Sequence, residues 1–396
     1  MIGKVIVQCG IQIDNEYWFA AGNTNGLFKK NLLTGELYFI DFFPDEAKTQ
    51  FRAYTDVKRV GNKLIFTPCY AKRIAIYNID DKKFSSVLLP EFKTGVNQYI
   101  KSVKYKDYIY FIPFSASFFI KYNVVEGNIK KLEEWTDLKK QYLDQGNNNL
   151  IIETVCTDNK DIYMFMNDKN YVIILNMDTD QFQVKSLDTS FDEKIYSVFR
   201  RDNNIWIVTN RNIIYKWNYV DNEILHIVDF NQYIKFRDYM IYNIYVTSKY
   251  VYLINMFDKD IMVFDYINRE FTIIDMNKYV SDKQDDYLSL YYYYDIQVTG
   301  NNKIELFSFY DGKYITIDGK AVINSNDGFL LSKEYFEKCF SNKFFSDESC
   351  LTYIAPSLFE KIEIILTQSM SVCDTEKYKE KNIGRIVYDA LTGTEM

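Results

Sequence analysis

The chain has 396 residues, with 47 Lys and Arg against 54 Asp and Glu, giving a net charge of −7. No segment gathers a strong positive field, which argues against general nucleic-acid binding. A hydrophobic content of 47% excludes a disordered chain, and no apolar run reaches the roughly 18 residues that a transmembrane helix needs.

The amino-terminal residues 1–19 do not resemble a signal peptide. Their apolar stretch is short, alternates with polar residues and lacks a small-residue cleavage site. Six cysteines are scattered without a C-x-x-C pair: Cys9, Cys69, Cys156, Cys339, Cys350 and Cys373. We therefore expect reduced thiols and a cytoplasmic location.

An Asn or Asp that closes an apolar run recurs along the chain, and another apolar residue follows it six positions later. The six full copies are Asn31/Leu37, Asn78/Phe84, Asn123/Ile129, Asn176/Phe182, Asn218/Ile224 and Asp265/Phe271. Asp318 heads a degenerate seventh copy. A mean period of about 48 residues, with strands in each unit, predicts an all-β fold, a β-propeller. We expect seven blades, with six or eight as alternatives.

The third unit shows the expected blade most clearly. A strand over Tyr99–Tyr105 leads through a two-residue turn to a strand over Tyr108–Ile112. A third strand covers Phe118–Tyr122, and a fourth begins at Ile129. The other second strands are expected at Tyr17–Ala20, Leu64–Thr67, Ile162–Met166, Ile205–Val208, Val251–Ile254 and Ile304–Phe309. The other third strands are expected at Leu27–Lys29, Ile74–Tyr77, Tyr171–Leu175, Ile213–Trp217, Ile261–Phe264 and Tyr314–Ile317.

The recurrent Asn or Asp has a structural explanation. Its side-chain oxygen can accept a hydrogen bond from the backbone N–H two residues on, which forms an Asx-turn and starts the last hairpin of the blade. Over roughly residues 1–325 the chain resembles kelch-like propellers, as in Ile76-Tyr77-Asn78 with Phe84. The kelch double glycine after the second strand is missing, because Pro68-Cys69 stands there. The resemblance therefore implies an architecture and no function.

The period breaks after the propeller, so we expect a propeller over residues 1–326 and a helical appendage over 327–396. Ser357–Glu360 forms a capping box, and helical spacing follows to residue 366. Further helices are expected over 382–391 and over Lys333–Phe340. The appendage would cap the propeller or serve as a docking or dimerisation element.

Catalytic options are few because the chain has one histidine, His226, in an expected outer fourth strand. Multi-histidine metal sites and histidine-bearing triads need residues that are absent. Streptogramin lyases share the propeller architecture but use histidines. We therefore expect no metal and no cofactor.

Paired carboxylates remain a possible catalytic device. Glycosidases need two Asp or Glu side chains around one groove, and Glu153 and Asp295 each interrupt an expected apolar inner strand. These two residues would be catalytic if the protein is an enzyme. They would otherwise form a solvated channel wall.

Aromatic and basic residues gather where the first strands begin, and these positions are expected to converge on one mouth of the central channel. Tyr with Arg or Lys can stack on and hydrogen-bond a sugar, a peptide or an anion. The expected ligand-binding residues are Arg52, Tyr54, Tyr99, Lys101, Tyr196, Arg237, Tyr242 and Tyr292. The alternative is that they only line the channel.

The sequence thus favours a non-catalytic recognition scaffold that binds a protein partner, a glycan or a small molecule at one mouth of the propeller. The alternative is a carbohydrate-active enzyme of the glycoside hydrolase or lyase type. A third hypothesis is a sensor that binds a small metabolite in the channel.

Overall fold

A computed structural model gives the fold of the protein. It describes residues 3–331, apart from residues 6, 23, 47–49, 51, 94, 144–154, 167–170, 188–192, 234–240, 256–257, 281–291, 309–312 and 327–329.

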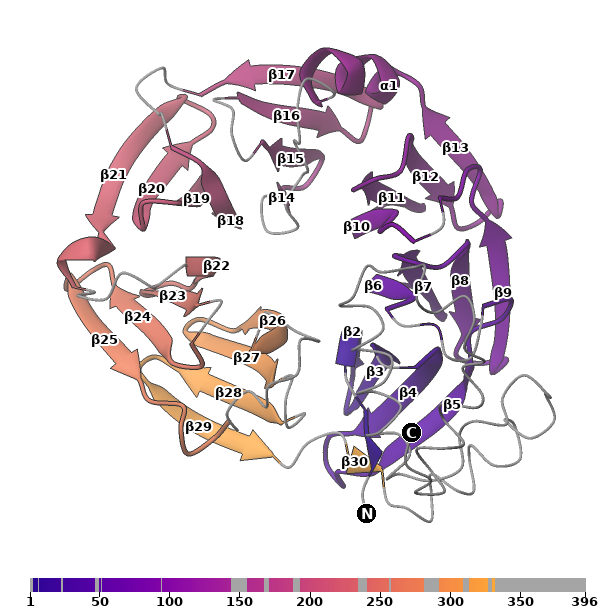
Figure 1. The fold of residues 1–396 in the computed structure, drawn as a ribbon, viewed down its shortest axis with the longest axis horizontal. Coiled ribbons are helices and arrows are strands. Elements are labelled where there is room, and N and C mark those ends of the chain that lie inside the picture. The colour runs from indigo at the N-terminus through magenta and orange to yellow at the C-terminus, as the bar shows by residue number, and fades with distance from the viewer. Residues whose placement is uncertain are drawn as a thin grey trace, which may run out of the picture.

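Seven four-stranded sheets stand in a ring, and each is an antiparallel meander of consecutive strands. In every blade the first strand faces the centre of the ring and the fourth forms its outer edge (Figure 1). The chain is therefore a seven-bladed β-propeller, as the repeat predicted.

The strands fall into four sets according to their place in the blade. The first strands are β2 (Val7–Ile13), β6 (Tyr54–Val60), β10 (Tyr99–Tyr105), β14 (Val155–Thr157), β18 (Ile195–Arg201), β22 (Ile241–Val246) and β26 (Tyr293–Thr299). The second strands are β3 (Glu16–Ala21), β7 (Lys63–Pro68), β11 (Tyr108–Pro113), β15 (Asp161–Phe165), β19 (Asn204–Thr209), β23 (Tyr250–Asn255) and β27 (Lys303–Ser308). The third strands are β4 (Gly26–Asn31), β8 (Arg73–Asn78), β12 (Phe119–Asn123), β16 (Tyr171–Asn176), β20 (Ile213–Asn218), β24 (Ile261–Asp265) and β28 (Tyr314–Asp318). The fourth strands are β5 (Leu37–Phe42), β9 (Lys83–Leu88), β13 (Asn128–Leu132), β17 (Gln181–Ser186), β21 (Glu223–Asp229), β25 (Glu270–Ile274) and β29 (Ala321–Asn326).

A few elements lie outside the blades. Strands β1 (Gly3–Lys4) and β30 (Leu330–Leu331) pair with each other and tie the chain after the seventh blade to its amino-terminal residues. Helix α1 (Glu134–Leu138) and a π-helical turn (Lys139–Leu143) follow the third blade. A 3₁₀ turn (Phe230–Gln232) follows the fifth blade.

The expected second and third strands are confirmed in all seven blades, and His226 lies in the outer strand β21. The helices expected over 333–340, 358–366 and 382–391 lie outside the described residues, so the helical appendage stays a prediction. Strand β30 extends the described β structure past the expected boundary at residue 326. Helix α1 was not expected from the sequence.

The recurrent Asn or Asp ends the third strand in each blade, and in six blades its Oδ1 accepts two backbone N–H bonds from the turn. The accepted pairs are Leu33/Thr34, Asp80/Asp81, Val125/Glu126, Asp178/Thr179, Val220/Asp221 and Ile267/Asn268. The expected Asx-turn is therefore present in all six full copies.

The same turns share a second requirement four residues after the Asx residue, where the backbone has a positive φ. That position holds Gly35, Lys82, Gly127, Asp180, Asn222 and Arg269, with φ between 54° and 76°. Gly, Asn and Asp tolerate this left-handed conformation, whereas Lys and Arg enter it at a cost. The Asx bonds therefore hold a turn shape that the local sequence does not always favour.

The turns between the third and fourth strands lie beside those between the first and second strands, at one end of the ring. The residue after the Asx donates its N–H to the neighbouring turn of the same blade. The pairs are Leu32–Asn15, Ile79–Asn62, Val124–Asp107, Met177–Lys160, Tyr266–Lys249 and Gly319–Asn302. We call this end of the ring the turn face, and it comprises residues 14–15, 32–36, 61–62, 79–82, 106–107, 124–127, 158–160, 177–180, 202–203, 219–222, 247–249, 266–269, 300–302 and 319–320.

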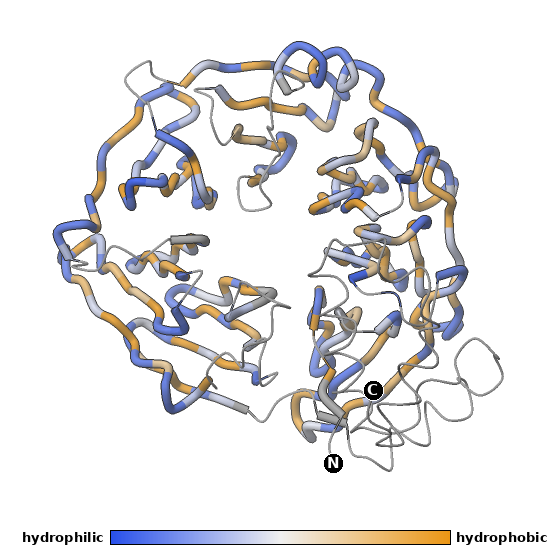
Figure 2. Tube along the Cα trace, viewed as in Figure 1, coloured by the Kyte–Doolittle hydropathy of each residue, from blue (hydrophilic) through white to orange (hydrophobic). Residues whose placement is uncertain are grey.

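The hydrophobic core is divided into seven clusters, and each lies between two neighbouring blades. Figure 2 shows hydrophobic residues along the strands of the whole ring. One cluster joins the seventh blade to the first, where the Phe307 and Tyr17 rings lie 4.6 Å apart. Because the inner strands are covered on both faces, they read as continuous apolar runs in the sequence.

In five blades an aromatic residue at the third position of the second strand contacts a residue beside the Asx residue of the next blade. The Tyr110 hydroxyl donates to the Met177 carbonyl at 2.8 Å, and the Tyr252 hydroxyl lies 2.9 Å from the Gly319 carbonyl. Rings make the contact elsewhere, in the pairs Trp18–Tyr77, Tyr163–Tyr219 and Trp206–Tyr266. The Asx-turns contacted in this way are held by their own blade and by the preceding one.

Replacing Asn123 with Ala removes the acceptor of the Val125 and Glu126 N–H groups. Because Asn123 is buried, we expect Asn123→Ala to lower the free energy of unfolding by about 1–2 kcal/mol. Urea unfolding followed by circular dichroism measures this loss. Asn123→Asp is the control, since it keeps the acceptor as Asp265 does in the sixth blade, and an equal loss in both variants would contradict the Asx-turn explanation.

Candidate functional site

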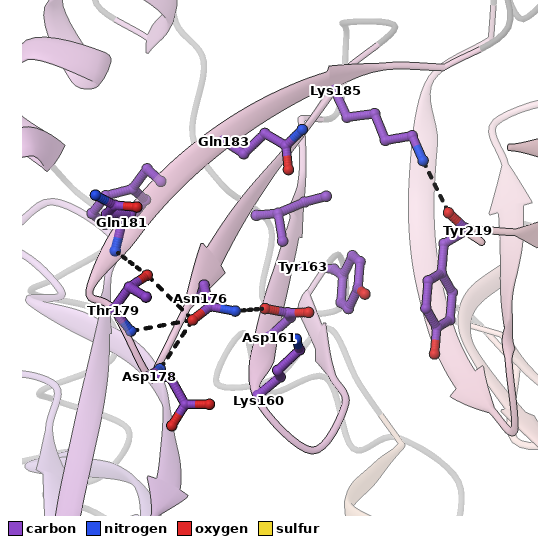
Figure 3. Close-up of a pocket in the computed structure, with 12 residues that line it drawn as sticks. Lys160, Asp161, Tyr163, Asn176, Asp178, Thr179, Gln181, Gln183, Lys185 and Tyr219 are labelled. Atoms are coloured by element: carbon purple, nitrogen blue, oxygen red, sulfur yellow. Dashed lines mark hydrogen bonds between the residues drawn. The ribbon is translucent and has the colours of Figure 1, made fainter. Parts of the chain in front are cut away.

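A groove of about 720 Å³ opens on the fourth blade, towards the fifth, and reaches the turn face (Figure 3). Its polar lining comes from β15, β16 and β17, from the turn before β15 and from the turn between β16 and β17, and Tyr219 of the fifth blade forms the far side. The polar lining residues are Lys160, Asp161, Tyr163, Asn176, Asp178, Thr179, Gln181, Gln183, Lys185 and Tyr219.

The far side of the groove is a fixed pair of tyrosines. Tyr163 and Tyr219 have ring centroids 5.1 Å apart, and both hydroxyls donate to Asp158 Oδ2, at 3.3 and 3.2 Å. Burial, followed by the nearby Asp158 and Asp161 charges, raises the pKa of Tyr163. The Tyr163 phenol is therefore a neutral donor at physiological pH, and Asp158 sets the positions of both rings.

The end of the groove at the turn face is built by the Asx-turn of the fourth blade. Asn176 accepts the Asp178 and Thr179 N–H groups and donates from Nδ2 to Asp161 Oδ1 at 2.8 Å. Burial raises the pKa of Asp161 despite this bond. Asp161 thus remains a partly buried carboxylate that would gain from a hydrogen-bond donor on a bound ligand.

The outer wall consists of side chains on β17 that point towards the fifth blade. Gln181 and Gln183 are exposed, and Lys185 donates to the Tyr219 carbonyl at 2.9 Å (Figure 3). These side chains therefore give the outer wall amide and ammonium groups, and Lys185 links β17 to the fifth blade.

Ion pairs between the third and fourth blades brace the same turn from its other side. Asp178 binds Lys106 Nζ at 2.5 Å, and hydrogen bonds from Lys106 and Tyr105 lower the pKa of Asp178. Asp180 contacts Lys121 Nζ at 2.6 Å and Lys130 Nζ at 3.1 Å. The turn that ends the groove is therefore rigidly placed.

Asp180 offers a test of this bracing. Burial raises the pKa of Asp180, but hydrogen bonds from Lys121, Tyr110 and Lys130 outweigh that effect and leave the pKa below its ordinary value. The Asp180 and Lys121 side chains are only 16% and 11% exposed. We expect Asp180→Asn to lower the free energy of unfolding by about 2–3 kcal/mol at pH 7, because it leaves Lys121 without its counter-charge.

The effect should depend on pH with a defined sign. A carboxyl whose pKa is depressed on folding stabilises the fold above its unfolded pKa, and that stability is lost as pH falls through the folded pKa. The difference between wild type and Asp180→Asn should therefore shrink below about pH 4. Urea unfolding at pH 7 and pH 3 tests this, and an unchanged difference would refute it. Lys130→Gln, at a position 64% exposed, is the control and should cost less than about 1 kcal/mol.

Three of the expected ligand-binding tyrosines, Tyr54, Tyr99 and Tyr292, are interior residues. Tyr54 and Tyr99 are each 1% exposed, and they pack on Phe66 and Phe111 between blades. A β-bulge follows the first residue of β6 and β10, between Tyr54 and Asp56 and between Tyr99 and Lys101. A one-residue shift moves a side chain to the other face of a strand, and a bulge also occurs near the start of β2, β18, β22 and β26.

The other expected site residues are spread along the ring. Lys101 lies on β10 with its Nζ 3.5 Å from the Val155 carbonyl, and Tyr196 lies half-buried on β18. Tyr292 is 8% exposed and packs between the sixth and seventh blades. Arg52 lies before β6 in a left-handed conformation, with φ of 48°. The structure does not bring these residues into one described site.

Four expected residues cannot be placed as side chains. Glu153 and Arg237 lie outside the described residues, and Asp295 and Tyr242 are described only as backbone positions in β26 and β22. The carboxylate pair of Glu153 and Asp295 therefore stays a prediction. The groove on the fourth blade was missed because polar residues on an outer strand look like an ordinary solvated face.

Other chemistry is limited in the part of the chain that the structure describes. No group of three or more His, Cys, Asp or Glu side chains there could hold a metal ion. Cys9, Cys69 and Cys156 are buried and form no disulfide in the described part of the chain, and burial raises the pKa of Cys69 and Cys156 to about 12. None of the described helices is long and apolar enough to cross a bilayer.

Comparisons with known proteins support the architecture. No protein-family model and no curated protein sequence matches the chain. Among solved structures, YCF48 from Cyanidioschyzon merolae matches with a TM-score of 0.55 and 12% identity, covering 83% of this chain and 95% of that one. The computationally designed Ika8 protein matches at 0.53 and 11%, covering 82% and 88%. A streptogramin B lyase matches at 0.50 and 14%, covering 82% and 94%. At these identities the matches show a shared fold.

Proposed function

We propose that the protein is a non-catalytic recognition scaffold that binds a protein partner, and that the groove on the fourth blade holds an extended segment of that partner. The observation that carries the proposal is the groove itself, with exposed amides along one wall and a fixed, hydrogen-bonded tyrosine pair on the other. Such a surface is preorganised, which reduces the entropy lost on binding.

The groove suits a peptide better than a glycan. Sugars stack on exposed aromatic faces, whereas Tyr163 is 3% exposed and its hydroxyl is held by Asp158. Gln181 and Gln183 can each donate to a backbone carbonyl and accept from a backbone N–H. The lining charges balance, with Lys160 and Lys185 against Asp161 and Asp178, so backbone hydrogen bonding rather than net charge would dominate binding.

Several finer features belong to the same proposal. We place the protein in the cytoplasm, on the distribution of its cysteines, and regard the appendage over 327–396 as a second contact or dimerisation element. The kelch-like resemblance is retained only as a description of the Asx repeat. Catalysis by Glu153 and Asp295 remains the alternative, and the separation of their carboxyl groups would decide it.

Gln183→Trp should fill the groove and weaken peptide binding at least tenfold, because a large side chain takes the place of the bound segment. Peptides selected from a displayed library of random 20-residue sequences provide the ligands, and fluorescence anisotropy measures their affinity for each variant.

Ser186→Trp is the matched control, since Ser186 is exposed on β17 but points to the opposite face. Equal affinity in the two variants would remove the groove from the proposal. A library that yields no peptide, while a glycan array yields a ligand, would contradict a protein partner.

A further inference from the structure

Exposed aliphatic side chains recur at one repeat position of the turn face, two residues after the Asx residue. We call Leu33, Val125, Val220 and Ile267 the turn aliphatics, and they are 76%, 76%, 67% and 62% exposed. They come from blades one, three, five and six. Scattered exposed hydrophobic residues are normal on protein surfaces, but these four share one structural position and one face.

The Asx-turn does not require an aliphatic residue there. That position contributes its backbone N–H to the Asx oxygen, and Asp80 and Asp178 fill it in the second and fourth blades. Four solvated aliphatic side chains on one face therefore bring no benefit to the turn itself. Apolar residues gathered on one exposed face are typical of interaction surfaces.

The charges around the turn aliphatics have one predominant sign. The turns between the third and fourth strands contain the acidic residues Glu36, Asp80, Asp81, Glu126, Asp178, Asp180 and Asp221, against the basic residues Lys82, Arg269 and Lys320. Asp178 and Asp180 are engaged by lysines. No ion pair in the described part of the chain joins Asp80, Asp81 or Asp221 to a basic residue, so their charges remain available to a partner.

We infer that the turn face is a docking surface for a basic polypeptide that carries exposed aliphatic or aromatic side chains. The turn aliphatics supply apolar contact, and the surrounding carboxylates attract and orient Lys and Arg residues of the partner. The inference rests on the proposed function, because it names the face and the chemistry of the partner that the scaffold binds. The groove on the fourth blade opens onto the same face and would take an extended end of that partner.

The test uses the full chain and a displayed library of random 20-residue peptides as the probe. One variant combines Leu33→Ser, Val125→Ser, Val220→Ser and Ile267→Ser. The matched control combines Leu88→Ser, Leu225→Ser, Ile273→Ser and Ile323→Ser, at outer-strand positions that are 58%, 53%, 47% and 54% exposed. Thermal unfolding verifies that both variants fold, as expected for such exposed positions.

Support consists of selected peptides enriched in Lys, Arg and apolar residues, whose affinity falls at least tenfold with the turn-face variant and less than twofold with the control. Their affinity should also fall several-fold between about 50 and 500 mM salt. Selected peptides that lose affinity with Gln183→Trp but not with the turn-face variant would overturn this inference and leave the scaffold function standing. If the selected peptides are acidic or uncharged, the inference that the partner is basic is wrong. If the library yields no binding peptide, both the inference and the proposed function are wrong.

Discussion

The fold depends on one hydrogen-bonding device, the Asx oxygen that accepts two N–H groups at the end of the third strand. It closes the last hairpin of a blade around a residue with positive φ, and it presents the next residue for further contacts. The N–H of this next residue donates to the first turn of the same blade. In the fourth blade its carbonyl also accepts a hydrogen bond from Tyr110 of the preceding blade. The Asx bonds thereby influence how neighbouring blades are placed, because the preceding blade contacts the turn that these bonds close.

The hydrophobic core lies between the blades, and no described cluster belongs to a single blade. Each of the seven hydrophobic clusters is built from two neighbours, so a single sheet could not bury its faces alone. Stability in such repeat proteins is approximately a sum of blade and interface contributions. The groove beside β17 lies at one of these interfaces, between the fourth and fifth blades.

The sequence predicted the features that a repeated residue pattern carries, and it missed backbone shifts and an element that occurs once. The Asx positions and the apolar strands recur in every blade, so the blade number, the second and third strands and the outer position of His226 could all be derived. Bulges occur near the start of six first strands, but residues of different types precede them, and the two at β6 and β10 come directly after the buried Tyr54 and Tyr99. Helix α1 occurs once, anchored by the packing of Trp135 on Phe119, and a five-residue helix has little periodicity to detect.

The contact from the second strand of one blade to the next blade has a direction, and it is present in five blades; the second blade has Ile65 at this position. At the seventh blade the aromatic position holds Glu305, and no described contact links that side chain to the turn of the first blade. The short β1–β30 pair and the Phe307–Tyr17 packing join the ends instead. Closing the ring therefore depends on contacts between residues far apart in the sequence, which carry a larger loop-closure cost than the contacts between consecutive blades.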